Sequence, residues 1–305
     1  MRYVPLLLAI VLTTCVTCKD NKSATRSRTK HKTHTYKICG QAYPLTATYI
    51  ECRKQTVDLQ KLVQFEHLKR LDLSNPRVTT FTPLLNLSQI RELDLDTTTF
   101  SDLYLLRNME NLKGLSIQQT QVLDLGPLRY LTALRSLLIS FSQARDFSPV
   151  AHLKNLRFIG IAHSPNLKHI RFLSKLRKLE YAMLADTGVS DLSPLRASRH
   201  TLRTIEIMDT KVSSLDQLRD FKNLERLFFS DTKIRDLSPL RHLHKLQRIH
   251  ADRTPVSDIT PLYRLKSLRL LSLGRTNVPR KQVELLRKLN PKLKIEHSPP
   301  RRLDW

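Results

Sequence analysis

An apolar pattern of the form L-x-x-L-x-L recurs along most of this chain, and it limits the possible folds more than any other feature. Successive copies are 22 or 23 residues apart and begin at Leu68, Ile90, Leu112, Leu134, Leu156, Leu179, Leu202, Leu224, Leu246 and Leu268. A fixed period over so many copies predicts a solenoid, in which each unit buries its apolar edge only against its neighbours. Because a solenoid grows in one dimension, we expect one folded domain rather than two.

The segment that follows each apolar pattern is repeated as well. The stretch TGVSDLSPL at residues 187–195 returns as TKIRDLSPL at residues 232–240. Alternating apolar residues in the first half of each unit predict a short strand with one apolar face. The remainder is too short for a full α-helix, so we expect it to return as a 3-10 segment that starts at a proline. These prolines are Pro127, Pro149, Pro194, Pro239 and Pro261.

On these residues the chain resembles the leucine-rich-repeat family, and within it the 22-residue class typified by bacterial internalins. The resemblance covers residues 39–295. It implies an α/β solenoid: a curved horseshoe with a parallel β-sheet on its concave face, short 3-10 or irregular convex segments, and a C-terminal capping helix. The repeats would occupy residues 68–275, between an N-terminal cap at residues 39–67 and a C-terminal cap at residues 276–295.

Six repeats carry a threonine two residues before an aliphatic residue. They are Thr120, Thr187, Thr210, Thr232, Thr254 and Thr276. In many leucine-rich repeats the corresponding residue is Asn, whose side chain pairs buried amides of the loop. Since buried backbone donors must be paired, we expect the hydroxyl to take over this role. The threonine column is therefore assigned to the scaffold.

The first residues have the layout of a secretory signal peptide. Arg2 precedes an apolar run from Val4 to Leu12, and small polar residues follow, so residues 1–18 are predicted to be the signal. An alternative interpretation takes LTTC as a lipoprotein signal in which Cys15 is acylated. No other apolar run is long enough to cross a bilayer. We therefore expect an exported protein that is secreted or associated with the cell envelope, without a transmembrane span.

The next segment predicts a tail and then a stapled cap. Residues 19–38 combine Lys and Arg with Ser and Thr and contain few apolar residues, which is typical of a disordered basic tail. Cys39 and Cys52 are the only cysteines beyond the predicted signal. In an exported chain an even pair is most simply a disulfide, so we expect a bridge that pins the N-terminal cap.

The C-terminal region departs from the repeat. Residues 276–295 lack the D-L-x-P-L turn and predict an amphipathic helix followed by a strand over residues 293–295. The apolar face of the helix would be formed by Val283, Leu286 and Leu289. Terminal units of solenoids are atypical because they must hide an apolar end. We expect this cap to be followed by a tail, residues 296–305.

The outward-facing strand positions change in character along the chain. In the first units they include Glu92, Asp94 and Asp96, whereas in the middle units they are aromatic and aliphatic. Aromatic and Met residues exposed together are typical of interface cores. We therefore predict that a protein partner binds on the concave face. The predicted contact residues are Leu138, Phe158, Tyr181, Met183, Met208 and Phe228.

The formal net charge of +25 is not explained by the concave face. The residue after the first leucine of each copy is usually cationic, and stacked strands lie about 4.8 Å apart. A ladder is predicted on one rim at Lys69, Arg91, Lys113, Arg135 and Arg157. Cations in such a row bind a linear anion in a salt-dependent way, so adhesion to an anionic glycan, lipid or other polyanion through the rim and tail is the alternative function. Sequence-specific recognition of nucleic acid is not predicted, because no recognition motif is present.

Catalytic motifs are missing from the sequence. There is no G-x-S-x-G, no glycine loop of the kind that cradles phosphates, and no H-E-x-x-H. His242 and His244 form an H-x-H on a polar return segment, where solvation is the simpler interpretation than metal binding. We expect a binding protein with no enzymatic activity and no cofactor or metal.

Overall fold

The computed structural model describes residues 35–53, 56–74 and 77–298. They belong to one compact unit that starts at Thr35. The predicted signal peptide, the alternative acylation site Cys15, most of the basic tail and most of the C-terminal tail lie outside the described residues. Within the described part of the chain, no helix combines the length and the apolar character needed to cross a membrane.

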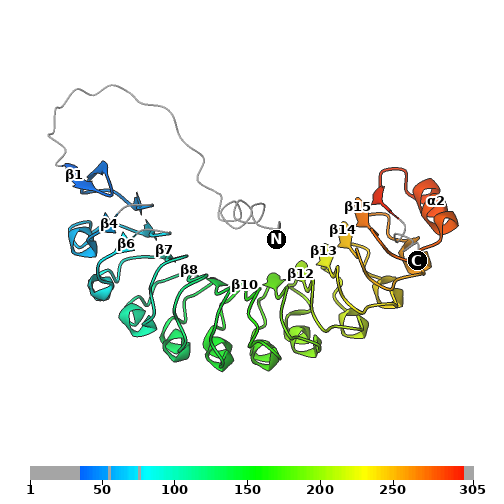
Figure 1. The fold of residues 1–305 in the computed structure, drawn as a ribbon, viewed down its shortest axis with the longest axis horizontal. Coiled ribbons are helices and arrows are strands. Elements are labelled where there is room, and N and C mark those ends of the chain that lie inside the picture. Colours follow the sequence, from blue (N-terminus) through cyan, green and yellow to red (C-terminus); the bar gives the residue numbers. More distant parts are fainter. Residues whose placement is uncertain (1–34, 54–55, 75–76, 299–305) are drawn as a thin grey trace, which may run out of the picture. The chain divides into compact units, whose positions relative to one another are not determined.

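Twelve short strands form one parallel sheet on the concave face of this unit (Figure 1). They are β3 (Tyr49–Glu51), β5 (Arg70–Asp72), β7 (Glu92–Asp94), β8 (Gly114–Ser116), β9 (Ser136–Leu138), β10 (Phe158–Gly160), β11 (Tyr181–Met183), β12 (Thr204–Glu206), β13 (Arg226–Phe228), β14 (Arg248–His250), β15 (Leu270–Ser272) and β16 (Lys294–Glu296). Neighbouring strands pair one repeat apart, so Leu71, Leu93 and Leu115 lie side by side. The predicted parallel sheet is confirmed.

Ten 3-10 helices return the chain along the convex side within the described residues (Figure 1). They are η1 (Leu59–Leu62), η2 (Thr82–Asn86), η3 (Leu103–Leu106), η4 (Gly126–Tyr130), η5 (Ser148–His152), η6 (Arg171–Lys175), η7 (Ser193–Ser198), η8 (Asp216–Leu218), η9 (Ser238–Leu240) and η10 (Thr260–Leu262). Two small sheets complete the unit. The strands β1 (Thr35–Ile38) and β2 (Gln41–Pro44) form an antiparallel hairpin, and β4 (Thr56–Val57) pairs with β6 (Arg77–Val78).

The repeated D-L-S-P-L stretch builds the start of the returns η7 and η9. The Asp191 carboxylate accepts a hydrogen bond from the backbone amide of Ser193 at 2.8 Å and another from its hydroxyl at 2.7 Å. Pro194 follows within the first two positions of η7, where the absence of an amide hydrogen leaves no hydrogen bond unmade. The aspartate therefore accepts from the amide of the first residue of the 3-10 helix, as Asp236 does in the later copy, and this explains why the stretch recurs.

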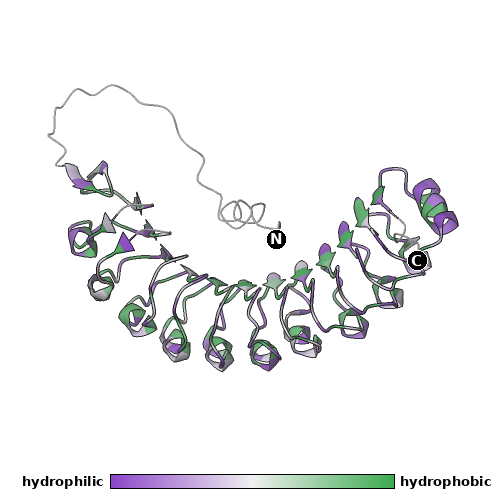
Figure 2. Ribbon diagram, in the orientation of Figure 1, coloured by the Kyte–Doolittle hydropathy of each residue, from purple (hydrophilic) through white to green (hydrophobic). Residues whose placement is uncertain are grey.

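The core is a continuous stack of side chains between the sheet and the returns. The inner residues of the strands, such as Leu71, Ile159 and Leu227, are completely buried, as are the phenylalanines Phe65 and Phe221. Figure 2 shows hydrophobic and hydrophilic residues alternating within the coils. This alternation follows from the two faces of a strand, of which only one can point into the core.

A left-handed residue ends the strand segment in each of nine repeats, a feature that the sequence analysis missed. Their φ angles lie between 52° and 61°, although none of them is glycine. They are Thr97, Gln119, Phe141, His163, Asp186, Asp209, Asp231, Arg253 and Arg275. The amide of each donates to a carbonyl of the next repeat, as from Gln119 to Ser140 at 3.2 Å. This bond between coils compensates for a conformation that non-glycine residues seldom adopt.

The threonine column follows directly after these left-handed residues. Thr187 donates its hydroxyl hydrogen to the carbonyl of Leu184 at 2.7 Å, and Thr232 does the same to Phe229 at 2.7 Å. The expectation that the hydroxyls pair backbone amides is therefore wrong at these positions. In this turn, the backbone carbonyl three residues before the threonine needs a hydrogen-bond donor. The threonine hydroxyl provides it.

The N-terminal cap begins with the β1–β2 hairpin. Strand β1 lies in the segment assigned by sequence to the basic tail, so the cap includes Thr35–Ile38, which precede the predicted boundary at Cys39. Ile38 is buried and the Tyr36 ring meets Phe65 edge-on at 6.3 Å between centroids, which ties the hairpin to the first coil. The predicted disulfide between Cys39 and Cys52 is present.

The C-terminal cap consists of helix α2 (Arg280–Leu289) and strand β16. Val283 and Leu286 are buried against the last repeat as predicted, but Leu289 is 39% exposed, so its assignment to the buried face is wrong. The helix ends at Leu289 and the chain turns there. Asn290 donates its side-chain amide to the carbonyl of Leu268 at 3.0 Å, and this bond joins the cap to the last repeat.

Candidate interaction surface on the concave face

The predicted contact residues lie together on the middle of the sheet. We call Leu138, Phe158, Tyr181, Met183, Met208 and Phe228 the concave patch. They lie on or just after strands β9 to β13, at positions that alternate with buried core residues. In Figure 1 no helix or strand of the described residues lies over these strands. Leu138 and Phe228 are 90 positions apart in sequence, but the register of the sheet places them on the same surface.

Side chains within the concave patch pack on one another. The rings of Phe158 and Tyr181 stack with centroids 4.4 Å apart and an angle of 23° between their planes. Gly160 lies between Leu138 and Met183 in the register. A Cβ atom at Gly160 would lie only 2.6 Å from Leu138 Cδ2 and 2.9 Å from Met183 Cε. The glycine therefore allows the two long side chains to close over it and makes the apolar surface continuous.

Tyr181 does not have the exposure that the sequence analysis assumed. Five members of the patch are half-buried, whereas Tyr181 is 9% exposed. The Phe158 ring covers Tyr181, and the Tyr181 hydroxyl donates a hydrogen bond to Glu206 Oε1. Burial, followed by the Glu206 charge and this bond, raises the Tyr181 pKa above its usual range. Tyr181 supports the patch from below instead of offering its own ring to a partner.

Glu206 belongs to this surface but was not recognised from the sequence. It lies in register between Met183 and Phe228, and it is 2% exposed. Its Oε1 atom accepts from Tyr181, but its Oε2 atom is buried with no hydrogen-bond partner among the described residues. Burial raises the pKa of this carboxyl. The outward register of position 206, shared with Met183 and Phe228, was the signal that could have revealed it.

The beginning of the concave face is acidic, as predicted, and its carboxylates are hydrogen-bonded. Asp72 accepts from Arg53 at 2.7 Å and from the Ser74 hydroxyl at 2.6 Å. Asp96 accepts from the Ser116 hydroxyl at 2.6 Å. Burial and the nearby Asp96 charge raise the pKa of Asp94 to about 7. In the described part of the chain, no three His, Cys, Asp or Glu side chains are arranged to hold a metal ion.

The predicted cationic ladder is stacked along the edge where the strands begin. The amide of each residue donates to the carbonyl of the one before it, as from Arg91 to Lys69 and from Lys113 to Arg91, both at 2.7 Å. Arg157 ends the row in an ion pair with Glu180 at 2.9 Å. The other four cations form no ion pair with any described residue. Their charge is thus available to an anion.

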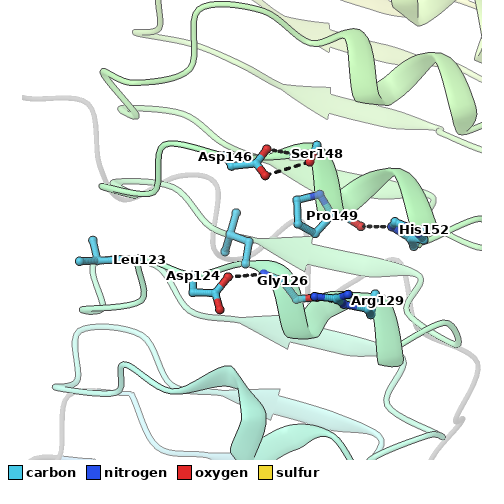
Figure 3. A pocket seen from close by; sticks show the side chains of 9 residues that line it. Leu123, Asp124, Gly126, Arg129, Asp146, Ser148, Pro149 and His152 are labelled. Atoms are coloured by element: carbon cyan, nitrogen blue, oxygen red, sulfur yellow. Dashed lines mark hydrogen bonds between the residues drawn. The ribbon is translucent and has the colours of Figure 1, made fainter.

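A hollow of about 340 Å³ opens between η4 and η5 on the return side (Figure 3). The polar groups around it already serve the turns: Asp124 accepts from the Gly126 amide at 2.7 Å, and the Arg129 Nε atom donates to the Gly126 carbonyl at 2.9 Å. Leu123 lies beside this hollow and is 63% exposed. Because its polar groups already form hydrogen bonds within their own turns, the hollow is not a candidate binding site.

No protein-family model matches the chain, and no curated protein sequence matches it. Solved structures, in contrast, are similar in fold. The internalin InlF from Listeria monocytogenes is 22% identical, with a TM-score of 0.68 over 87% of this chain and 87% of that chain. The functional domain of InlJ from the same organism, which includes a cysteine ladder, is 18% identical, with a TM-score of 0.65 over 82% of this chain and 57% of that chain.

A plant receptor shares the same architecture. The ectodomain of the membrane receptor kinase GASSHO1/SCHENGEN3 from Arabidopsis thaliana, in complex with CASPARIAN STRIP INTEGRITY FACTOR 2, is 16% identical to this chain. Its TM-score is 0.64, and the match covers 82% of this chain but only 32% of the receptor. At these identities the similarity concerns the fold. The sequence period, the parallel sheet and these likenesses together show that the chain has a leucine-rich-repeat fold, similar to that of internalins.

Proposed function

We propose that this chain is an exported interaction module that binds a protein partner on the concave patch. The observation that carries the proposal is the continuous aromatic and Met surface across β9 to β13, with no described helix or strand over it. Apolar patches of this kind mark interaction sites, and aromatic and Met residues are enriched in interface cores. A curved sheet also offers a partner more contact than a flat surface of the same width.

The comparisons support a binding role without naming the partner. The receptor ectodomain that shares this fold was solved with another molecule bound to it. The Cys39–Cys52 disulfide is typical of exported proteins and supports the assignment of the first residues to a signal peptide. The proposed action is binding, and it requires no catalytic group, metal or cofactor.

Capture of partners by the purified protein tests the proposal. We expect the variant with Phe158→Asp and Phe228→Asp to lose every specifically captured protein, because two buried charges would have to be desolvated in the interface. A matched variant with Tyr104→Asp and Tyr130→Asp changes two exposed aromatic residues of the convex side, and we expect it to keep its partners. Retention of the same proteins by the concave variant, with a native circular dichroism spectrum, would refute the proposal.

A second candidate function is supported by the ladder on the rim. Lys69, Arg91, Lys113 and Arg135 are stacked and have no ion pair with described residues, so they can neutralise an anionic glycan or lipid surface. Heparin chromatography and vesicles of anionic lipid test it. Changing the four cations to Ala should lower the salt concentration of elution more than changing four cations of the return segments. Equal shifts would show that only the net charge matters. The control positions are Lys175, Arg196, Arg241 and Arg264.

A further inference from the structure

The concave patch contains one carboxylate whose hydrogen bonding is incomplete. Glu206 is surrounded in the sheet by Met183 on β11 and Phe228 on β13, and only one of its two oxygen atoms has a partner among the described residues. Buried polar atoms are nearly always paired, so a buried carboxylate oxygen without a donor is unusual. The acidic end of the same face shows that this chain can satisfy carboxylates where it carries serine and arginine beside them.

Arg226, a cation whose charge acts on Glu206, does not complete the pairing. Its Nε atom donates to the Thr204 hydroxyl at 2.9 Å, and no ion pair joins Arg226 to Glu206 among the described residues. Tyr181 is the other titratable group that faces Glu206, and its hydroxyl donates a hydrogen bond to Glu206 Oε1. The described residues therefore leave Oε2 for a donor from outside.

Access to Glu206 depends on flexible side chains. Met183 and Phe228 flank it and are half-buried, and no described helix or strand packs over them. A methionine side chain has three rotatable bonds and adapts readily to a partner. We expect rotation of the Met183 side chain to open a path from the concave face to the carboxylate.

We propose that the protein partner inserts an arginine side chain into the concave patch and donates a hydrogen bond from its guanidinium group to Glu206 Oε2. This inference rests on the proposed function and specifies the partner for the same site. Arginine fits better than lysine because its planar group stacks on aromatic rings and is weakly hydrated, and the half-buried Phe158 and Phe228 provide such rings. An anchor buried at the centre of an apolar surface has the arrangement of an interface hot spot.

Short peptides with a single changed group test this assignment. The probes are acetylated and amidated Trp-Arg-Trp, the same peptide with the uncharged arginine analogue citrulline, and the same peptide with lysine. The purified protein is labelled at the methionine methyl groups. Met183 and Met208 then report on the patch by NMR, and Met109, which is completely buried, serves as an internal control.

We expect the arginine peptide to shift the Met183 and Met208 signals and to bind about tenfold or more tightly than the citrulline peptide, as for a charge-assisted hydrogen bond. Glu206→Gln should remove this preference. Glu180→Gln, which changes an exposed carboxylate outside the patch, should keep it. Lysine and arginine peptides of equal affinity would overturn the choice of arginine.

Two other results would overturn the inference. One is equal affinity for the arginine and citrulline peptides, and the other is an arginine preference that survives Glu206→Gln. The absence of any binding by the arginine peptide at millimolar concentration would also contradict it. None of these outcomes decides the proposed function, because that is judged separately by partner capture with the Phe158→Asp and Phe228→Asp variant.

Discussion

Two groups of carboxylates occupy outward positions of one sheet, and they differ in how their oxygen atoms are paired. At the acidic end, Asp72 and Asp96 accept several hydrogen bonds from neighbouring side chains. In the middle, Glu206 lies among apolar side chains, and the described residues provide a partner for only one of its oxygen atoms. The same type of position can thus form a self-sufficient polar network or an unsatisfied group that a ligand can complete. The difference depends on the side chains one repeat away.

The buried faces of the sheet at the acidic end and at the concave patch are expected to contribute equally to stability. Leu93 behind the acidic end and Leu227 behind the concave patch are both buried in the same column. Changing either to Ala should lower the free energy of unfolding by about 2–5 kcal/mol, because it removes apolar contacts and leaves a cavity. Urea denaturation followed by circular dichroism measures this. A much smaller loss at Leu227 would mean that the two regions differ in the core as well as at the surface.

Neutralising one carboxylate in each region should change stability in opposite directions. Burial raises the Glu206 pKa, so this group destabilises the folded state increasingly as the pH rises through its folded-state pKa. At about pH 8, Glu206→Gln should raise the free energy of unfolding by about 1–3 kcal/mol. Asp72→Asn should lower it by a similar amount, because the bonds from Arg53 and Ser74 are weakened.

The two variants share one measurement, urea denaturation at neutral and acidic pH. The Glu206→Gln effect should disappear below the pKa of an unfolded glutamate, where both states are protonated. Changes of the same sign in both variants would remove the distinction between a satisfied and an unsatisfied carboxylate.

The smallest expected effect concerns pH at the acidic end. Asp94 has a pKa of about 7, raised by burial and by Asp96, so the folded state keeps a proton that the unfolded state has already lost. The free energy of unfolding should therefore fall by about 1.4 kcal/mol between pH 6 and pH 8. Asp94→Asn should reduce this fall. Carbon-detected NMR of the carboxyl groups can follow the titration, and a midpoint near pH 4 would contradict the prediction.

Much of the fold followed from the sequence because its cause is local and repeated. Leucines at a fixed interval require neighbours on both sides, and the five prolines that follow an aspartate predict 3-10 turns in their repeats. The left-handed residues were missed because they include Phe141, His163 and Arg253, which give no local signal for a positive φ. Their conformation is supported by hydrogen bonds to the next coil rather than by their own preference.

The candidate surface was predicted only in outline. The register placed Leu138, Phe158 and Met183 on the concave face, but it did not reveal that Tyr181 is covered or that Glu206 lies among them. Exposure and pairing depend on contacts between residues 22 to 25 positions apart, such as the one between Tyr181 and Glu206. A pattern of residue types along the chain does not contain these distances.

By itself, the sequence determined that this protein is a leucine-rich-repeat solenoid, which residues form its core, and which side chains face the concave surface. Those properties depend on periodicity, which the repeated copies of the pattern display without any coordinates. Only the tertiary structure decided which of the outward side chains are buried, which carboxylates are satisfied and where one lacks a partner. These depend on the exact neighbours that stacking brings together, because burial and hydrogen bonding are properties of pairs of residues in space.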